Sequence, residues 1–130
     1  MELVNNYVKV LKNYADFSGR ARRREYWLFF LVNATINFVL MALMINLFLT
    51  ALFRPPVSAV LIVIHFVYNL TMLLPALAAA VRRLHDIGKS WHWIFVAFVP
   101  FIGLIWFIVL MATEGETGDN RFGPNPKSVL

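Results

Sequence analysis

Three long segments of the chain contain almost no charged side chain, and each is long enough to cross a bilayer as a helix. Residues 26–53 contain no charge, residues 57–81 contain only His65, and residues 91–113 contain only His92. A hydrocarbon core about 30 Å thick requires roughly 20 apolar residues in helical form. The sequence therefore predicts an all-α, polytopic membrane protein with three transmembrane helices.

The composition agrees with this fold class. Hydrophobic residues make up 60% of the chain, against roughly 45–50% in soluble domains. The three segments leave no room for a separate soluble domain, so we expect residues 1–130 to form one membrane domain. The chain has no cysteine, which excludes disulfides and thiol chemistry, and we expect neither a metal site nor a cofactor.

The two ends of the chain differ in pattern. Residues 3–14 place apolar and polar side chains on opposite sides of a helix, which predicts an amphipathic helix lying in the lipid headgroup layer. Packing of that helix on the protein's own surface is an equal alternative. Residues 114–130 are rich in Gly, Pro, Asn and Asp, which predicts an irregular tail.

The distribution of Lys and Arg predicts the orientation of the chain. Six precede the first span, one (Arg54) lies in the first loop, three lie in the second loop and two in the tail. Because positive charge is enriched on the cytoplasmic side, this alternation favours a cytoplasmic N-terminus and an external tail. If Pro100 and Gly103 instead mark a re-entrant turn, the tail returns to the cytoplasmic side.

Basic residues beside the spans are typical of contacts with lipid phosphates rather than with nucleic acid. Gly88 suits the position that follows a helix C-terminus, and Arg121 is the tail's obvious anchor. Asp86 is expected to pair with an arginine among residues 20–24, which would join the N-terminal segment to the second loop. The candidates for contact with anionic lipid or a membrane partner are Arg20, Arg23, Arg24, Trp27, Arg82, Arg83, His85, Asp86 and Arg121.

Four polar side chains inside the spans form a possible intramembrane seam: Asn33, Asn37, His65 and Asn69. Asn37 lies about 16 Å from the start of the first span and Asn69 about 18 Å from the end of the second, at 1.5 Å per residue. These matching depths predict a hydrogen bond between Asn37 and Asn69 in an antiparallel hairpin. We favour a role in holding helices together over a path for a substrate or proton.

Three segments resemble, in the same order, motifs of a family of small bacterial inner-membrane proteins known as domain of unknown function 805. They read FSGRARRREYW at residues 17–27, RRLHDIGKS at 82–90 and GDNRFGPNP at 118–126. The likeness extends over about residues 14–126. It implies a plasma-membrane protein and supplies no activity, and it implies that the three segments act together, which is easiest if the tail shares a side with the first two.

The chain departs from the family pattern in two segments. Residues 91–93 read Trp-His-Trp, where the family usually has Gly and aromatic residues. The tail has Phe122 and Asn125, where the family usually has Tyr and Asp. A role that requires that hydroxyl or that carboxylate is therefore in doubt for this chain.

The sequence leaves three hypotheses of function. The first is a non-enzymatic membrane protein whose basic interfacial motifs bind anionic lipid headgroups or a membrane partner, with homo-oligomerisation left open. The second is a small transporter or channel subunit that uses the polar seam. The third is a membrane enzyme that uses His85 and Asp86, although neighbouring residues on a helix point in different directions.

Overall fold

The computed structural model describes residues 1–50 and 55–128, and every regular element of this part of the chain is helical. The all-α prediction is confirmed. Residues 51–53, which end the first predicted span, and Arg54 lie outside the described residues. The elements are α1 (Glu2–Lys12), α2 (Arg23–Thr50), α3 (Pro55–Asp86), the 3₁₀ helix η2 (Trp91–Phe98) and α4 (Gly103–Ala112).

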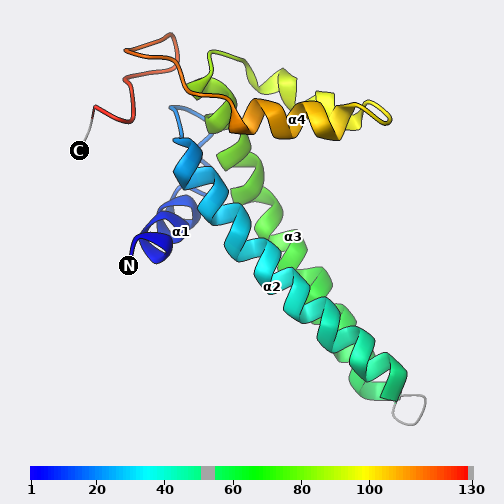
Figure 1. Cartoon of the computed structure of the whole chain (residues 1–130). Coiled ribbons are helices and arrows are strands. Elements are labelled where there is room, and N and C mark those ends of the chain that lie inside the picture. The colour runs from blue at the N-terminus through cyan, green and yellow to red at the C-terminus, as the bar shows by residue number, and fades with distance from the viewer. Residues whose placement is uncertain (51–54, 129–130) are drawn as a thin grey trace.

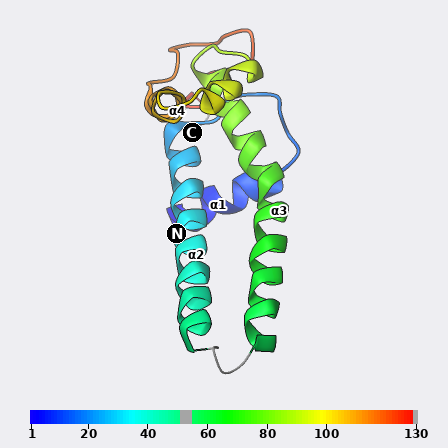
Figure 2. The ribbon, with the colours of Figure 1, turned by 90° about the vertical axis from the view of Figure 1, so that its right-hand side faces the viewer.

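The two long helices α2 and α3 lie side by side and run in opposite directions (Figures 1 and 2). Arg23–Thr50 and Ala59–Asp86 are each 28 residues long and strongly apolar, and only 6% of the residues in their most apolar windows are buried. The core helix of a soluble protein is mostly covered by other elements, whereas these helices expose their apolar surface. Their length and composition match membrane-spanning helices.

The third predicted membrane helix, over residues 91–113, is not formed. The segment is divided into η2 and the ten-residue helix α4, which turn back on each other as a hairpin beside the ends of α2 and α3 (Figure 1). Ten helical residues extend only about 15 Å, roughly half of a hydrocarbon core. The alternative from the sequence, a re-entrant turn at Pro100 and Gly103, requires such a hairpin.

Local chemistry explains the turn between η2 and α4. Val99 precedes Pro100 and has an extended backbone with ψ 123°, because the proline ring disfavours a helical conformation in the preceding residue. Phe101 has a positive φ of 67°, which only tight turns impose on such a residue. A Cβ on Gly103 would lie 2.2 Å from the backbone oxygen of Val96, so glycine allows the two arms to approach closely.

The C-terminal end of α4 is fixed to α2 and α3 by side chains that bind its last carbonyl groups. The backbone oxygen of Met111 accepts hydrogen bonds from Arg83 Nε at 3.0 Å and Trp27 Nε1 at 3.2 Å. The backbone oxygen of Ala112 accepts one from Arg23 Nη1 at 3.2 Å. Cationic donors suit this end of a helix, whose free carbonyl groups carry partial negative charge.

The N-terminal helix α1 packs on the protein's own surface. Val10 is buried with Phe29 and Ala79, and the Tyr7 ring stacks on Phe29 with centroids 5.4 Å apart. The prediction of a helix here is confirmed, and the packing follows the alternative that the sequence leaves open. Whether α1 also lies in the headgroup layer stays a prediction, although side chains such as Val4 are exposed.

The tail lies beside the end of the α2–α3 helix pair where α2 begins and α3 ends (Figure 1). Its backbone is bound there by Arg20, whose Nη1 atom donates to the oxygen of Gly118 at 2.7 Å. The tail and the N-terminal segment therefore lie together at one end of the helix pair, whereas the count of Lys and Arg predicted opposite sides of the membrane. That prediction assumed that residues 91–113 form one helix, whereas the structure divides them between η2 and α4.

Gly88 ends α3 as the sequence predicts. It has a left-handed backbone with φ 75°, and the amide of Lys89 donates to the oxygen of Leu84 at 2.9 Å while that of Gly88 donates to His85 at 3.0 Å. This pair of bonds is the Schellman arrangement that commonly ends a helix at glycine. The turn directs the chain from α3 into η2.

Candidate functional site

The carboxylate of Asp86 is buried and binds two arginines. Arg20 Nε donates to its Oδ1 atom at 3.0 Å, and Arg83 Nη1 donates to its Oδ2 atom at 2.7 Å. The exposed fraction of these three side chains is 4% or less. The predicted pair between Asp86 and an arginine of residues 20–24 is confirmed. Because burying charge is costly, such a pair is stable only when hydrogen bonds satisfy its polar atoms.

Arg20 also binds the tail, so one side chain joins all three motif segments. Besides Gly118, it donates from Nη2 to the backbone oxygen of Glu116 at 2.6 Å. The amide of Glu116 in turn donates to the backbone oxygen of Asp86 at 2.8 Å. A Cβ on Gly115 would lie only 2.1 Å from Asp86 Oδ2. The tail therefore passes directly over the Asp86 carboxylate.

A second buried carboxylate, Glu25, was not among the candidates from the sequence. It accepts hydrogen bonds from Arg82 Nη1 at 3.1 Å and from Lys9 Nζ at 2.9 Å, and its side chain is 1% exposed. One signal was available in the sequence: Glu25 is the only acidic residue between Asp16 and Asp86, and it directly follows three arginines. A single acidic residue beside a cluster of arginines is expected to form an ion pair.

The third carboxylate, Glu114, binds Arg23 and Lys127 at the surface, where all three side chains are about half exposed. The hydrogen bond from Lys127, together with the charge of Arg23, lowers the pKa of Glu114 below its usual value. We call the three carboxylates and their six cationic partners the charged cluster. Its members are Glu25, Asp86, Glu114, Lys9, Arg20, Arg23, Arg82, Arg83 and Lys127.

His85 joins the N-terminal segment and the tail instead of forming an acid–base pair with Asp86. Its Nδ1 atom lies 2.9 Å from the backbone oxygen of Gly19, and its ring stacks on Phe122 with centroids 3.9 Å apart. The Asn120 amide donates to its backbone oxygen at 2.9 Å. This stacking needs only an aromatic ring, so Phe122 can make it without the hydroxyl group of the tyrosine that is usual at this position. Within the described residues, no three His, Asp or Glu side chains gather to hold a metal ion.

Two predicted contact residues lie at the surface. Arg24 pairs with Glu2 at 2.8 Å, and both side chains are exposed. Arg121 is exposed and lies over the Phe122 ring, 4.6 Å from its centroid. The tail is held by Arg20 and by the stacked ring of Phe122, so Arg121 is not its anchor. Contact of these residues with lipid stays a prediction.

The polar seam is only partly assembled. Asn37 and Asn69 donate to backbone oxygens of their own helices, Asn33 and His65 respectively, so the predicted Asn37–Asn69 hydrogen bond is not formed. Helix α3 instead binds α2 through Tyr68, whose hydroxyl donates to Asn33 Oδ1 at 2.6 Å. The sequence analysis missed Tyr68 because the sequence does not tell how α3 is rotated about its axis, and this rotation decides whether Tyr68 faces α2.

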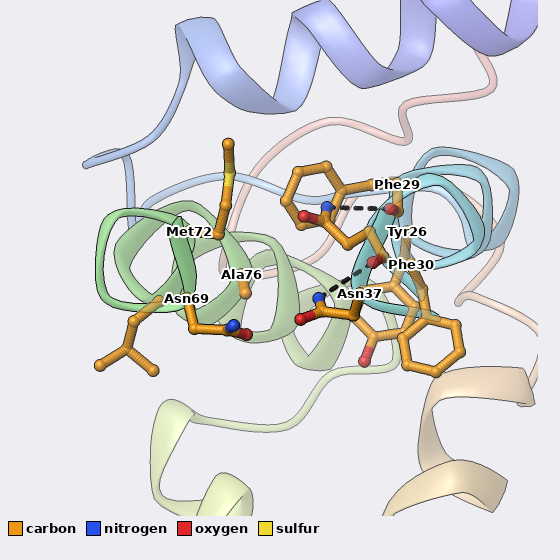
Figure 3. A pocket seen from close by; sticks show the side chains of 9 residues that line it. Tyr26, Phe29, Phe30, Asn37, Asn69, Met72 and Ala76 are labelled. Carbon is orange, nitrogen blue, oxygen red and sulfur yellow. Dashed lines mark hydrogen bonds between the residues drawn. The ribbon is translucent and has the colours of Figure 1, made fainter. Parts of the chain in front are cut away.

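Three of the four seam residues line one groove between α2 and α3, with a volume of about 220 Å³ (Figure 3). They are Asn33, Asn37 and Asn69, and the rest of the lining is mostly apolar or aromatic. His65 is not among the lining residues. The four side chains therefore do not follow a single path through the helix pair.

Comparison with known proteins gives one family and closely related sequences. A family model described as protein of unknown function (DUF805) matches residues 14–124. The chain is 45% identical to the inner membrane protein YhaI of Escherichia coli (strain K12), over 93% of this chain and 94% of that protein. It is also 45% identical to the inner membrane protein YhaH of the same strain, over 93% and 95%. No solved structure matches the chain.

We call the end of the helix pair that holds the charged cluster, where α2 begins and α3 ends, the charged end. The substitution Asp86→Asn is expected to destabilise it strongly. It removes the charge that Arg20 and Arg83 share and leaves both guanidinium groups buried without a counter-ion, which costs about 3–5 kcal/mol. Thermal unfolding in detergent measures the loss. Asp119→Asn is the control, because Asp119 is exposed and accepts only a backbone hydrogen bond. Equal stability of the two variants would contradict the role of Asp86.

The contact between Glu114 and the end of the tail is expected to depend on pH. Because the folded state lowers the pKa of Glu114, its contribution is present above the ordinary glutamate pKa and is lost as the pH falls through the lowered value. A spin label on a single cysteine, Ser128→Cys, should gain mobility over that range. In the Glu114→Gln variant this part of the pH response should be absent, and its persistence there would rule out Glu114 as the cause.

Proposed function

The chain belongs to the DUF805 family, and we propose that it is a bacterial inner-membrane protein without catalytic activity whose charged end binds anionic lipid headgroups. The names of the Escherichia coli relatives support the location. The apolar, exposed surfaces of α2 and α3 support insertion in lipid. The geometry of the charged cluster carries the proposal of lipid binding.

The observation that carries it is an excess of positive charge held in place by the fold. Each of the three carboxylates in the charged cluster is shared by two cations, so six positive charges face three negative ones. Outside this cluster the same end has five more Lys and Arg residues, among them the exposed Lys12 and Arg121, against four Asp and Glu residues, so its overall excess is four positive charges. Anionic headgroups attract basic residues near the membrane surface, at about 1 kcal/mol each.

The contacts divide the predicted lipid-binding residues into two groups. Arg20, Arg82 and Arg83 are buried and bind other parts of the protein, as His85 and Asp86 do, so we assign them to the fold. Arg23, Arg24 and Arg121 are exposed, and we assign these to headgroups, together with Lys12. Trp27 is partly buried and binds the backbone oxygen of Met111 in α4, so we assign it to the fold as well.

We further propose that the chain crosses the membrane twice and that its charged end, including both termini, is cytoplasmic. The ends of α2 and α3, the N-terminal segment and the tail gather eleven of the twelve Lys and Arg residues, and Arg54 is the twelfth. This asymmetry fits the enrichment of positive charge on the cytoplasmic side. The hairpin of η2 and α4, which has no Asp, Glu, Lys or Arg, would enter the cytoplasmic leaflet and return.

Reporter fusions after Leu130 test this topology. A fluorescent protein that folds only in the cytoplasm should be bright, and alkaline phosphatase fused at the same position should be inactive. A single cysteine at Phe101, at the turn of the hairpin, should resist a membrane-impermeant thiol reagent added from either side. An active alkaline phosphatase fusion would place the tail outside and overturn the arrangement.

Native mass spectrometry of the protein with phosphatidylglycerol tests lipid binding. The triple variant Lys12→Gln, Arg24→Gln, Arg121→Gln removes three exposed charges without touching a buried ion pair. Its affinity for phosphatidylglycerol should fall at least tenfold, since each charge contributes about 1 kcal/mol. Its affinity for the zwitterionic lipid phosphatidylcholine should not change.

A variant that conserves charge is the matched control. Lys12→Arg, Arg24→Lys, Arg121→Lys alters the same three positions and keeps the positive charges, so it should bind phosphatidylglycerol like the unmodified protein. Unchanged binding in the glutamine variant, or an equal loss in both variants, would refute charge-driven headgroup binding.

A further inference from the structure

We propose that the groove between α2 and α3 is the site at which a second copy of this chain binds, so that the protein is a two-fold symmetric dimer in the membrane. The groove has a volume of about 220 Å³ and is lined by side chains of both helices, among them Asn37, Asn69 and Ala76. Asn69 and Ala76 are exposed, so the groove is open at the side where another helix can approach.

The hydrogen bonds of the groove leave two amide groups incompletely used. Asn33 donates to the oxygen of Phe29 and accepts from Tyr68. Asn37 and Asn69 each donate one hydrogen bond to a backbone oxygen, and within the described part of the chain no donor is found for either Oδ1 atom. Figure 3 shows both side chains extending into the space between the helices.

The depth of these amides makes an additional partner necessary. At 1.5 Å per residue, Asn37 lies about 16 Å along α2 from Tyr26, and Asn69 lies about 18 Å along α3 from Val81, where the uncharged run of each helix meets its charged end. Both amides are therefore close to the middle of a hydrocarbon core about 30 Å thick. Lipid chains offer no hydrogen bonds, and an unsatisfied amide group there costs several kcal/mol. An occupant that carries its own donors and acceptors at the same depth removes this cost.

A second copy of the chain meets this requirement by symmetry. With the orientation proposed above, every copy inserts in the same direction, so a two-fold axis along the membrane normal brings residues of equal depth together. An asparagine amide is both donor and acceptor, which allows it to pair with an identical group. The small side chain of Ala76, two turns from Asn69, permits the close approach of helices that is typical of membrane interfaces.

Single cysteines test the position of the interface, since the chain has no cysteine of its own. Leu73 and Val67 are both 53% exposed and lie about 120° apart around α3, and Leu73 lines the groove. In native membranes treated with a permeant oxidant, Leu73→Cys should form a disulfide-linked dimer of this chain. Val67→Cys, the matched control, should not.

The contribution of the amides is measured by the monomer–dimer equilibrium in lipid nanodiscs or detergent. Asn37→Leu and Asn69→Leu should each weaken dimerisation by about threefold or more, the effect of one interhelical hydrogen bond in a membrane. Thr71→Val is the control, because the Thr71 hydroxyl donates to Val67 of its own helix and this residue is not among those that line the groove.

Three results would overturn the proposal: equal cross-linking of the two cysteine variants, cross-linking of Leu73→Cys to a different protein, or a monomer at every protein concentration. Dimerisation is read independently of lipid binding. A dimer that does not bind phosphatidylglycerol would therefore refute the proposed function and leave this inference standing. A monomer that binds phosphatidylglycerol would refute this inference and leave the proposed function standing.

Discussion

A buried carboxylate shared by two cations is the interaction on which the charged end depends. Removing an arginine from water is costly, and the cost is offset only when its charge is paired and its donors are satisfied. The Asp86 carboxylate pairs with Arg20 of the N-terminal segment and with Arg83 of α3, and backbone oxygens of the tail accept the remaining hydrogen bonds of Arg20. One requirement thus brings together residues that are far apart in the sequence, and it leaves positive charge in excess.

Features that depend on composition and local chemistry were predictable from the sequence. The uncharged runs identified α2 and α3, and the glycine after a basic helix end identified the termination at Gly88. The Asp86–arginine pair was predictable in kind, because a single acid beside an arginine cluster has few partners. Two other contacts were not predictable from the sequence: the burial of Glu25 against Arg82, and the hydrogen bond between Tyr68 and Asn33. Both depend on how each helix is rotated, which hydropathy does not encode.

The segment after α3 shows where a rule based on length fails. Residues 91–113 are apolar enough and numerous enough to cross a bilayer. A hydropathy average, however, does not test whether all of these residues can form one helix. Pro100 restricts the backbone of Val99, and Gly103 allows the chain to fold back against Val96. With both ends held near α3, the segment returns to the charged end, which is why the three family motifs meet there.

The sequence distance between the partners of Arg20 constrains the order in which the protein is completed. Asp86 follows it by 66 residues and Gly118 by 98. Translation proceeds at about 5–20 residues per second, so Arg20 is synthesised roughly 3–13 s before its first counter-ion. During that interval the guanidinium group of Arg20 lacks the carboxylate that it binds in the folded chain. The contacts of Arg20 can therefore be completed only after α2, α3 and the start of the tail have been synthesised.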